Sequence, residues 1–309
     1  MGTILITGGS GLVGRALTDL LLKKGYQIII LTRKITDKNP RPNLKYALWD
    51  IKKNIIDLKA IQESDYIIHL AGAGVVDKKW TAAYQQEIID SRVNSSSLII
   101  ETLKNNPNKI KALISSSAIG WYGPDLSSNH PFVETDKHDD SFLGNTCKLW
   151  EESVEPAQQM GIRVCKLRTG IVLSTEGGAL KEFLKPIKLG VAAILGSGKQ
   201  MVSWIHIHDL CRMFLFAIEN EEMSGSYNAV APHPVTNKNL TLTLAKQIKG
   251  IFFIPSYVPS FILRLMMGKR SIEVLKSCFV SSEKISKSGF TFFFPSIEGA
   301  LKDLFTKKL

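Results

Sequence analysis

The sequence contains no apolar run approaching the ~20 residues that a membrane-spanning helix needs. Its apolar stretch 257–267 is interrupted by Pro259 and Arg264, so this stretch predicts a buried helix instead. No signal-peptide pattern precedes the first predicted strand, which begins near the N-terminus. We therefore expect a cytoplasmic protein with no membrane partner.

Cysteine is also scarce: the 309 residues include four, none in a C-x-x-C pair, namely Cys147, Cys165, Cys211 and Cys278. This usage predicts buried thiols in a reducing compartment rather than a disulfide framework. His206 and His208 alternate on a strand-like run, but no cluster of carboxylates or cysteines accompanies them, and a metal site needs three or four ligands. We therefore predict no metal site, structural hydrogen bonds for both histidines, and a helix cap at Asp209.

Acidic residues are outnumbered, because 28 Asp and Glu stand against 39 Lys and Arg, giving a formal net charge of +11. The positive residues are scattered among acidic ones and no aromatic–basic repeat occurs, so we predict no nucleic-acid partner. The charge is interpreted as mostly solvated surface that also suits an anionic cofactor and substrate. The hydrophobic content of 44% is ordinary for a globular chain and allows one large domain or two closely packed lobes.

Glycine is concentrated near the start of the chain. A short apolar strand leads into Gly8, Gly11 and Gly14 at G-x-x-G-x-x-G spacing, and a helix follows. The first glycine permits a tight turn, the second lets the backbone approach a pyrophosphate, and the third lets the helix pack on the strand. Leu12 and Val13 open the helix, whose free N–H groups and positive dipole end favour a phosphate. This pattern predicts a dinucleotide-binding loop rather than a simple strand–helix turn.

The second predicted strand is not followed by a carboxylate, which would favour the ribose 2′-OH of NAD. Arg33 and Lys34 stand there instead, and the next carboxylate is Asp37. A guanidinium fits a 2′-phosphate and Lys34 adds a second positive charge, whereas the alternative is two solvated basic residues at a strand end. The pattern predicts NADP as the cofactor.

Strand and helix patterns alternate from residue 3 to about 170. The predicted strands are 3–7, 27–32, 45–49, 65–70, 110–116 and 162–168, and the predicted helices are 12–24, 57–63, 81–105 and 139–160. This order predicts an α/β fold with a doubly wound parallel Rossmann sheet. Residues 1–170 would form the NADP-binding Rossmann domain, with a returning segment near 200–230. Residues 171–309 would form a smaller C-terminal α+β lobe that binds the substrate.

Several motifs resemble the extended short-chain dehydrogenase/reductases, the nucleotide-sugar epimerase-like superfamily; they lie at 7–14, 69–72, 115–118 and 204–210. Further motifs resemble one atypical branch, the bacterial and organellar "epimerase family proteins", some labelled cell-division inhibitors; these lie at 80–81, 90–94, 120–123, 167–173, 196–198 and 231–237. The resemblance covers essentially the whole chain. It implies NADP-dependent oxidoreductase or epimerase chemistry on a small polar substrate. A homodimer is a candidate assembly.

The resemblance also implies individual cofactor contacts. Besides the glycine loop, it assigns the adenosine phosphate to Arg33. Leu70, Ala71 and Gly72 match the strand end that passes the adenine–ribose side of the cofactor, and Asn94 matches a helix asparagine that supports the active site.

For catalysis, the resemblance assigns the substrate oxygen to Ser117, with Ser116 as second choice. Arg168 and Thr169 would lie near the nicotinamide and contact either the cofactor or the substrate.

The family's catalytic Tyr-x-x-x-Lys is incomplete in this chain. Lys148 can occupy the lysine position, 31 residues after Ser117, but the tyrosine position is then Gly144. Lys148 would bind the nicotinamide ribose or would be a solvated helix lysine. Tyr122, the nearest phenol, would either replace the lost acid or pack beside Trp121. Two hypotheses therefore remain: an NADP-dependent oxidoreductase or epimerase-like enzyme, and an NADP-binding regulatory or interaction protein that has lost the acid.

Overall fold

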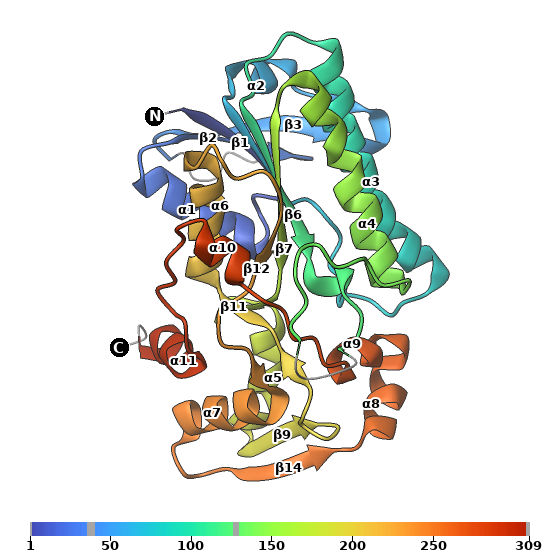
Figure 1. The fold of residues 1–309 in the computed structure, drawn as a ribbon, viewed down its shortest axis with the longest axis vertical. Helices are drawn as coiled ribbons and strands as arrows, with labels where there is room; N and C mark the ends of the chain where they lie inside the picture. The colour runs from blue at the N-terminus through green and yellow to red at the C-terminus, as the bar shows by residue number, and fades with distance from the viewer. Residues whose placement is uncertain (1, 36–40, 126–129, 307–309) are drawn as a thin grey trace.

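An eight-stranded sheet forms the larger lobe of the computed structural model, which describes residues 2–35, 41–125 and 130–306 (Figure 1). The strand order is β12–β7–β6–β5–β1–β2–β3–β4, and every neighbouring pair is parallel except β3 with β4. The strands are β1 (Thr3–Thr7), β2 (Gln27–Thr32), β3 (Leu44–Asp50), β4 (Ile55–Ile56), β5 (Tyr66–His69), β6 (Ala112–Ala118), β7 (Arg163–Thr169) and β12 (Gly225–Ala229). All six predicted strands are confirmed, each with ends within two residues of its predicted position.

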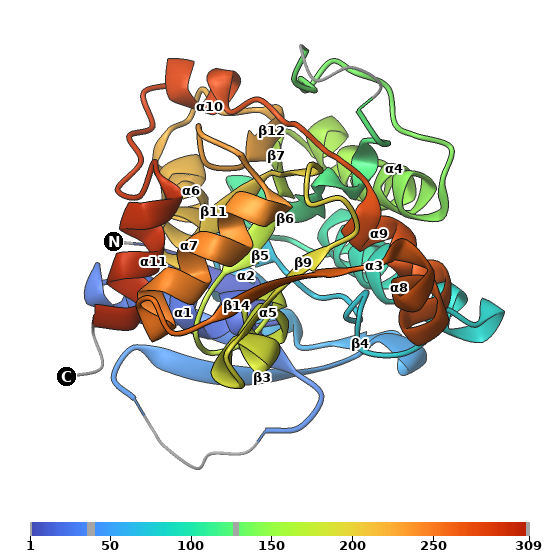
Figure 2. The ribbon, with the colours of Figure 1, turned by 90° about the horizontal axis from the view of Figure 1, so that it is seen from below.

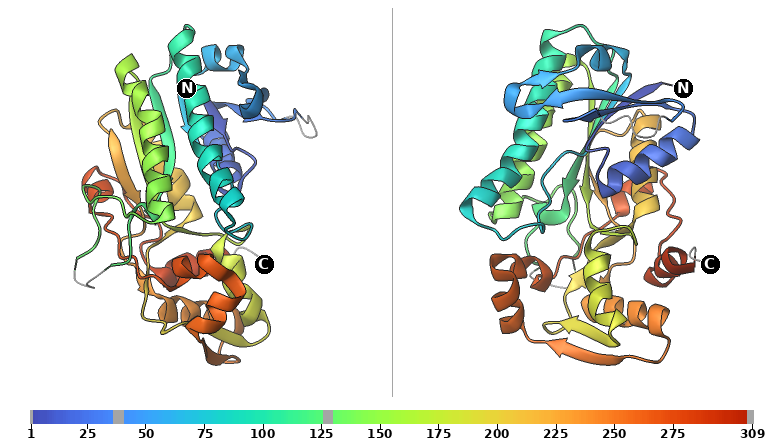
Figure 3. Two further views of the ribbon diagram at one scale, coloured as in Figure 1. Left: turned by 90° about the vertical axis from the view of Figure 1, so that its right-hand side faces the viewer. Right: turned by 180° about the vertical axis from the view of Figure 1, so that it is seen from behind.

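Helices cover both faces of this sheet because the strands are apolar on both sides. Ile4 and Ile6 of β1 pack into a core under α1 (Leu12–Lys23) and α6 (Ile207–Glu219). Leu5, between them, faces the opposite core with residues of α2 (Leu58–Glu63) and α3 (Ala82–Asn105). Figure 3 shows α3 beside α4 (Phe142–Val154) on that face. The doubly wound Rossmann prediction is therefore confirmed.

The second lobe is smaller and is built from short strands and helices (Figure 2). Its strands are β8 (Ile171–Leu173), β9 (Val191–Leu195), β10 (Met201–Val202), β11 (Trp204–His206), β13 (Val235–Thr236) and β14 (Ile254–Val258). Its helices are α5 (Ala179–Lys188), α7 (Asn237–Lys249), α8 (Ser260–Met267), α9 (Ser271–Leu275) and α11 (Ile297–Thr306), whereas α10 (Glu283–Lys287) packs through Ile285 into the core of the large sheet. The strands pair two by two, β10 with β13, β11 with β8 and β14 with β9, and a separate core joins α5, α7 and α11.

The chain returns to the large sheet after its first passage through the second lobe. The segment near 200–230, for which a return was predicted, contains α6 and β12. The helix packs against the β1–α1 side, and β12 pairs in parallel with β7 at the sheet edge. The predicted boundary at residue 170 follows the end of β7 directly.

Two local predictions are wrong. The stretch 257–267 is not a buried helix, because it includes the end of β14 and the surface helix α8, in which Leu265 is 86% exposed. Asp209 does not cap α6, because the His206 side chain accepts the His208 N–H at that helix start. The Asp209 carboxylate instead accepts the backbone N–H groups of Phe293 and Phe294, which ties the C-terminal segment to α6.

Among the described residues, no helix is long and apolar enough to cross a membrane.

Candidate functional site

The β1–α1 loop has the shape that a dinucleotide pyrophosphate requires. Gly8 has φ +69°, and a Cβ there would lie 2.8 Å from the Leu70 carbonyl carbon. A Cβ at Gly14 would overlap the Gly8 carbonyl oxygen, so this position also requires glycine. A Cβ at Gly11 would meet only that oxygen, at 3.2 Å, and otherwise open space. The loop is therefore closed against the sheet and open outward at its middle glycine, where a phosphate fits.

The start of α1 favours an anion at the same place. Gly11 is the N-cap residue and offers no side-chain acceptor, so the N–H groups of Leu12 and Val13 are available to a ligand. No acidic residue occupies the first turn. The Arg15 guanidinium donates to the Ser10 carbonyl at 2.7 Å and adds positive charge beside the loop.

Arg33 and Lys34 follow β2, and both are exposed. Between the end of β2 and residue 35, the described chain contains no carboxylate. The Thr32 hydroxyl donates to the Lys34 carbonyl at 3.0 Å and so shapes this turn. Asp37 lies outside the described residues. The basic pair therefore stands at the carboxyl end of the strand next to β1, where an adenosine phosphate would be expected.

The end of β5 is held against the glycine loop by Thr7. Its Oγ1 accepts the N–H groups of Leu70 and Ala71 at 3.1 and 3.2 Å and lies 2.7 Å from Nδ1 of His69. Burial and the positive charge of Arg92 lower the pKa of His69 to about 4, so the imidazole is neutral. This network fixes Leu70, Ala71 and the exposed Gly72 at the edge of the site without exposing the histidine to a ligand.

On α3, Arg92 faces this strand end and Asn94 does not. Asn94 is exposed, whereas Arg92 is 9% exposed and donates to the Ala73 and Ile88 carbonyls at 3.1 and 2.9 Å. A Cβ at Gly72 would lie 3.2 Å from the Arg92 guanidinium carbon. The structure thus places Asn94 away from the site, and Arg92 is a residue that the sequence analysis missed.

On α4, the helix face that meets the end of β6 carries Leu143 and Cys147. A Cβ at Gly120 would contact both side chains, at 3.2 and 3.6 Å, and the Cys147 thiol lies 3.6 Å from the Ala118 carbonyl. Lys148 points elsewhere: it pairs with Glu152 at 3.8 Å, and its side chain is 43% exposed. These contacts favour the solvated-lysine alternative.

The tyrosine position assigned to Gly144 is filled by backbone. A Cβ at Gly144 would overlap the Asp139 carbonyl oxygen, and the Asp139 N–H is itself bonded to the Trp121 carbonyl at 2.8 Å. The backbone of the segment before α4 therefore occupies the position that the Cβ atom of any other residue at 144 would need. No phenol could be carried there without moving this backbone.

Ser117 and Arg168 meet in a buried ionic network around Glu151. The Glu151 carboxylate accepts Ser117 Oγ at 2.7 Å, Arg168 Nε and Nη2 at 2.8 and 3.0 Å, and Ser226 Oγ at 2.9 Å. Burial alone would raise the pKa of Glu151, but hydrogen bonds and the charges of Arg168 and Lys166 hold it below its usual value. The hydroxyl of Ser117 and the guanidinium of Arg168 are thus directed into the interior.

Tyr122 belongs to the same network. Its hydroxyl donates to Asn228 Oδ1 at 2.7 Å and accepts from Arg168 Nη1 at 3.0 Å, and its ring stacks on Phe132 with centroids 5.0 Å apart. The side chain is fully buried, and burial holds its pKa well above the ordinary value. These contacts favour the packing alternative over an acid–base role.

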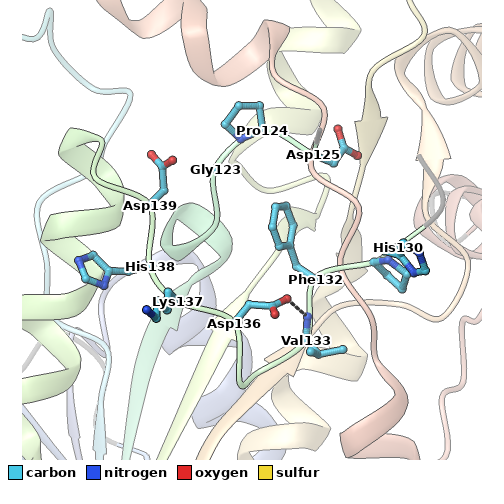
Figure 4. A pocket seen from close by; sticks show the side chains of 11 residues that line it. Gly123, Pro124, Asp125, His130, Phe132, Val133, Asp136, Lys137, His138 and Asp139 are labelled. Atoms are coloured by element: carbon cyan, nitrogen blue, oxygen red, sulfur yellow. Dashed lines mark hydrogen bonds between the residues drawn. The ribbon is translucent and has the colours of Figure 1, made fainter. Parts of the chain in front are cut away.

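A separate hollow of about 720 Å³ opens between two arms of the β6–α4 connection, 123–125 and 130–139 (Figure 4). Figure 4 shows Phe132 pointing from the second arm toward the first, and Asp136 accepting the Val133 N–H at 2.8 Å. None of the residues predicted from the sequence lines it. We place the candidate site at the strand ends instead, because the glycine loop, Arg33 and the end of β5 converge there. Within the described chain, no cluster of three or more His, Cys, Asp or Glu could hold a metal ion.

Comparisons with known proteins match the whole length of the chain. Residues 4–230 match the family model described as the NAD dependent epimerase/dehydratase family, and residues 258–304 match a domain of unknown function, DUF1731. An epimerase family protein of Staphylococcus aureus (strain MRSA252) is 37% identical over 307 residues, covering 99% of this chain and 100% of that protein.

Solved structures give the same result. The human epimerase family protein SDR39U1 (isoform 2), solved with NADPH, has a TM-score of 0.85 at 28% identity and covers 99% of this chain and 100% of its own. A nucleoside-diphosphate sugar epimerase from Corynebacterium glutamicum has a TM-score of 0.76 at 30% identity, covering 97% of this chain but 57% of its own.

Proposed function

Because the chain belongs to the NAD-dependent epimerase/dehydratase family, as its motifs predicted, we propose that it binds NADP(H) and transfers hydride to or from a small polar substrate. The observation that carries the proposal is the glycine loop, which is closed against β5 and open at Gly11. The human relative solved with NADPH supports the choice of cofactor. A cytoplasmic location, a homodimer and the absence of a nucleic-acid partner remain part of this proposal.

Each cofactor-binding residue has a defined task in this proposal. The N–H groups of Leu12 and Val13 bind the pyrophosphate, and Arg33 with Lys34 binds the 2′-phosphate. Leu70, Ala71 and Gly72 form the wall beside the riboses. When bound, the nicotinamide supplies or accepts the hydride.

Proton transfer is the step for which this chain lacks the family's usual group. Burial raises the pKa of the inward-facing Cys147 to about 12, so this thiol stays protonated and is a weak acid. The predicted roles of Ser117 and Tyr122 would require their hydroxyls to leave the network around Glu151 and Arg168. We therefore expect hydride transfer with slow or substrate-assisted protonation, and little turnover of ordinary sugar-nucleotide epimerase substrates.

A second candidate is an NADP-binding regulatory or interaction protein. It is favoured by the α4 face toward β6, where Leu143 and Cys147 offer neither a phenol nor an amine. Both candidates share the cofactor site and differ only in turnover.

The cofactor claim is tested by titrating the protein with NADPH and NADH by calorimetry. We expect NADPH to bind at least about tenfold more tightly, since a charge-assisted phosphate contact contributes ~1.5–3 kcal/mol. Arg33→Ala should remove this preference, whereas the control Arg41→Ala, an exposed arginine paired with Asp19, should keep it. Equal affinities for the two cofactors in the parent protein would contradict the proposal.

The choice between the two candidates needs a turnover measurement. Consumption of NADPH is followed with a panel of carbonyl compounds and nucleotide sugars, beside Gly11→Val as the cofactor-free control. Any NADPH oxidation that Gly11→Val abolishes supports the enzyme, and tight NADPH binding without turnover on the panel favours the regulatory protein.

A further inference from the structure

A guanidinium without a counterion lies beside the cofactor site, at the interface of α3 and α4. Arg92 is 9% exposed, yet no ion pair joins it to a carboxylate anywhere in residues 2–35, 41–125 or 130–306. Both of its hydrogen bonds leave from Nη1, to the carbonyls of Ala73 and Ile88. Nε and Nη2 therefore have no acceptor among the described residues. Neither nitrogen is among the fully buried atoms that lack a partner, so this edge of the guanidinium reaches solvent and is open to an incoming anion.

A second unsatisfied donor belongs to the same cluster. The Arg92 guanidinium carbon lies 4.9 Å from the ring centroid of Trp150 on α4. The indole Nε1–H of Trp150 is buried and has no hydrogen-bond partner in the described chain. Buried indole N–H groups usually find an acceptor. Two neighbouring side chains thus offer unused donors and no acceptor.

The location of the cluster relates it to the proposed catalytic cleft. The guanidinium lies under Gly72, which follows the strand end that touches the glycine loop through Gly8. Cys147, the inward residue of α4, precedes Trp150 by one helical turn, and its thiol contacts the end of β6. The cluster therefore sits between the ends of β5 and β6, where a substrate beside the nicotinamide would extend.

We propose that Arg92, assisted by the indole N–H of Trp150, binds a carboxylate group of the substrate. This inference rests on the proposed function, because it takes the carboxylate to belong to the substrate that reacts with the bound cofactor. A full positive charge with a free edge of the guanidinium fits the two oxygens of a carboxylate better than a neutral hydroxyl. The residue thus determines specificity by selecting acids over their neutral analogues.

The probes are pyruvate and malonate, each compared with its neutral amide, pyruvamide and malonamide. Binding to the parent protein loaded with NADP⁺ is measured by calorimetry and by the indole N–H signal of Trp150 in ¹⁵N–¹H spectra, assigned with Trp150→Phe. We expect saturable binding of at least one carboxylate with a shift of this signal, and at least about tenfold weaker binding of its amide.

The variants separate recognition from folding. Arg92→Gln should weaken carboxylate binding at least about tenfold, and Arg92→Lys, which keeps the charge but loses the fork, should have an intermediate effect. The matched control is Arg163→Gln, because Arg163 also donates to backbone carbonyls, those of Ala217 and Met223. It is the first residue of β7, whereas the proposed site lies at the carboxyl ends of the strands. It should leave carboxylate affinity unchanged.

Three results would overturn this inference: no saturable binding of either carboxylate, equal binding of acid and amide, or unchanged affinity in Arg92→Gln. If Arg92→Gln instead weakens NADPH and leaves the carboxylates unaffected, the donors serve the cofactor and the substrate assignment is wrong. The proposed function is judged separately by NADPH binding to the parent protein. Tight NADPH binding without carboxylate binding refutes only the inference about Arg92.

Discussion

Replacing Glu151 by Gln should strongly destabilise the protein. The carboxylate is 3% exposed and accepts four hydrogen bonds, from Ser117 Oγ, Arg168 Nε and Nη2, and Ser226 Oγ. Gln keeps the shape but removes the charge, and its amide NH₂ would face groups that donate. Breaking a buried pair leaves the other charge uncompensated, so we expect a loss of ~3–5 kcal/mol in the free energy of unfolding.

The measurement is urea unfolding of the parent and of Glu151→Gln at several pH values. Because the folded pKa of Glu151 lies below its unfolded value, its stabilisation is present above the unfolded pKa and is lost as the pH falls through the folded pKa. The difference between the two proteins should therefore narrow below about pH 4. The matched control is Glu152→Gln, since Glu152 pairs with Lys148 at the surface and should contribute at most about 1 kcal/mol. A loss below about 1 kcal/mol for Glu151→Gln at neutral pH would refute this reasoning.

Three further outcomes follow from the same contacts. His69 is buried with a pKa lowered to about 4 from 6.5, so stability should fall by about 3 kcal/mol as the pH decreases through this window, and His69→Gln should flatten that slope in pH-dependent urea unfolding. Gly144→Ala should lower stability by at least about 2 kcal/mol in thermal unfolding, because its Cβ would overlap the Asp139 carbonyl oxygen; a melting temperature equal to that of the parent would contradict this packing. Gly11→Val should keep the native circular dichroism and lose NADPH binding, and retained binding would place the pyrophosphate elsewhere.

The features predicted correctly from the sequence are those specified by short-range patterns. The first strand, the glycine turn and the helix after it each depend on residues that are close together in the sequence. Gly25, with φ +86°, follows the C-cap residue of α1 in the left-handed conformation that glycine adopts readily. Short-range sequence patterns were therefore enough to predict most of the larger lobe.

The inward faces of α3 and α4 were harder to predict. Successive side chains of a helix point in directions about 100° apart, so an alignment that is wrong by one residue selects a different face of the helix. The Tyr-x-x-x-Lys pattern pointed to Lys148 because it is the only lysine at a suitable spacing. The buried face of α4 instead carries the stripe Leu143, Cys147, Trp150 and Val154. On α3, Arg92 interrupts a buried stripe that continues through Ile88 and Ile99. A charged residue inside an apolar stripe was the signal that could have identified it.

The buried network could not be predicted from spacing at all. Glu151, Arg168 and Ser226 come from α4, β7 and β12, which are distant in sequence and meet only after the sheet has formed. Exposed carboxylates and arginines look the same in a sequence as buried ones. Their pairing depends on the strand order, which places β12 beside β7.

The position of β12 has a consequence for how the chain is made on the ribosome. When Thr169 leaves the exit tunnel, the edge of β7 has no partner, and residues 170–224 must emerge before Gly225 can begin to cover it. During that interval the nascent sheet presents a row of unpaired backbone groups to other chains. Premature termination between these points would release an aggregation-prone fragment, so the later part of the chain protects the earlier part during biosynthesis.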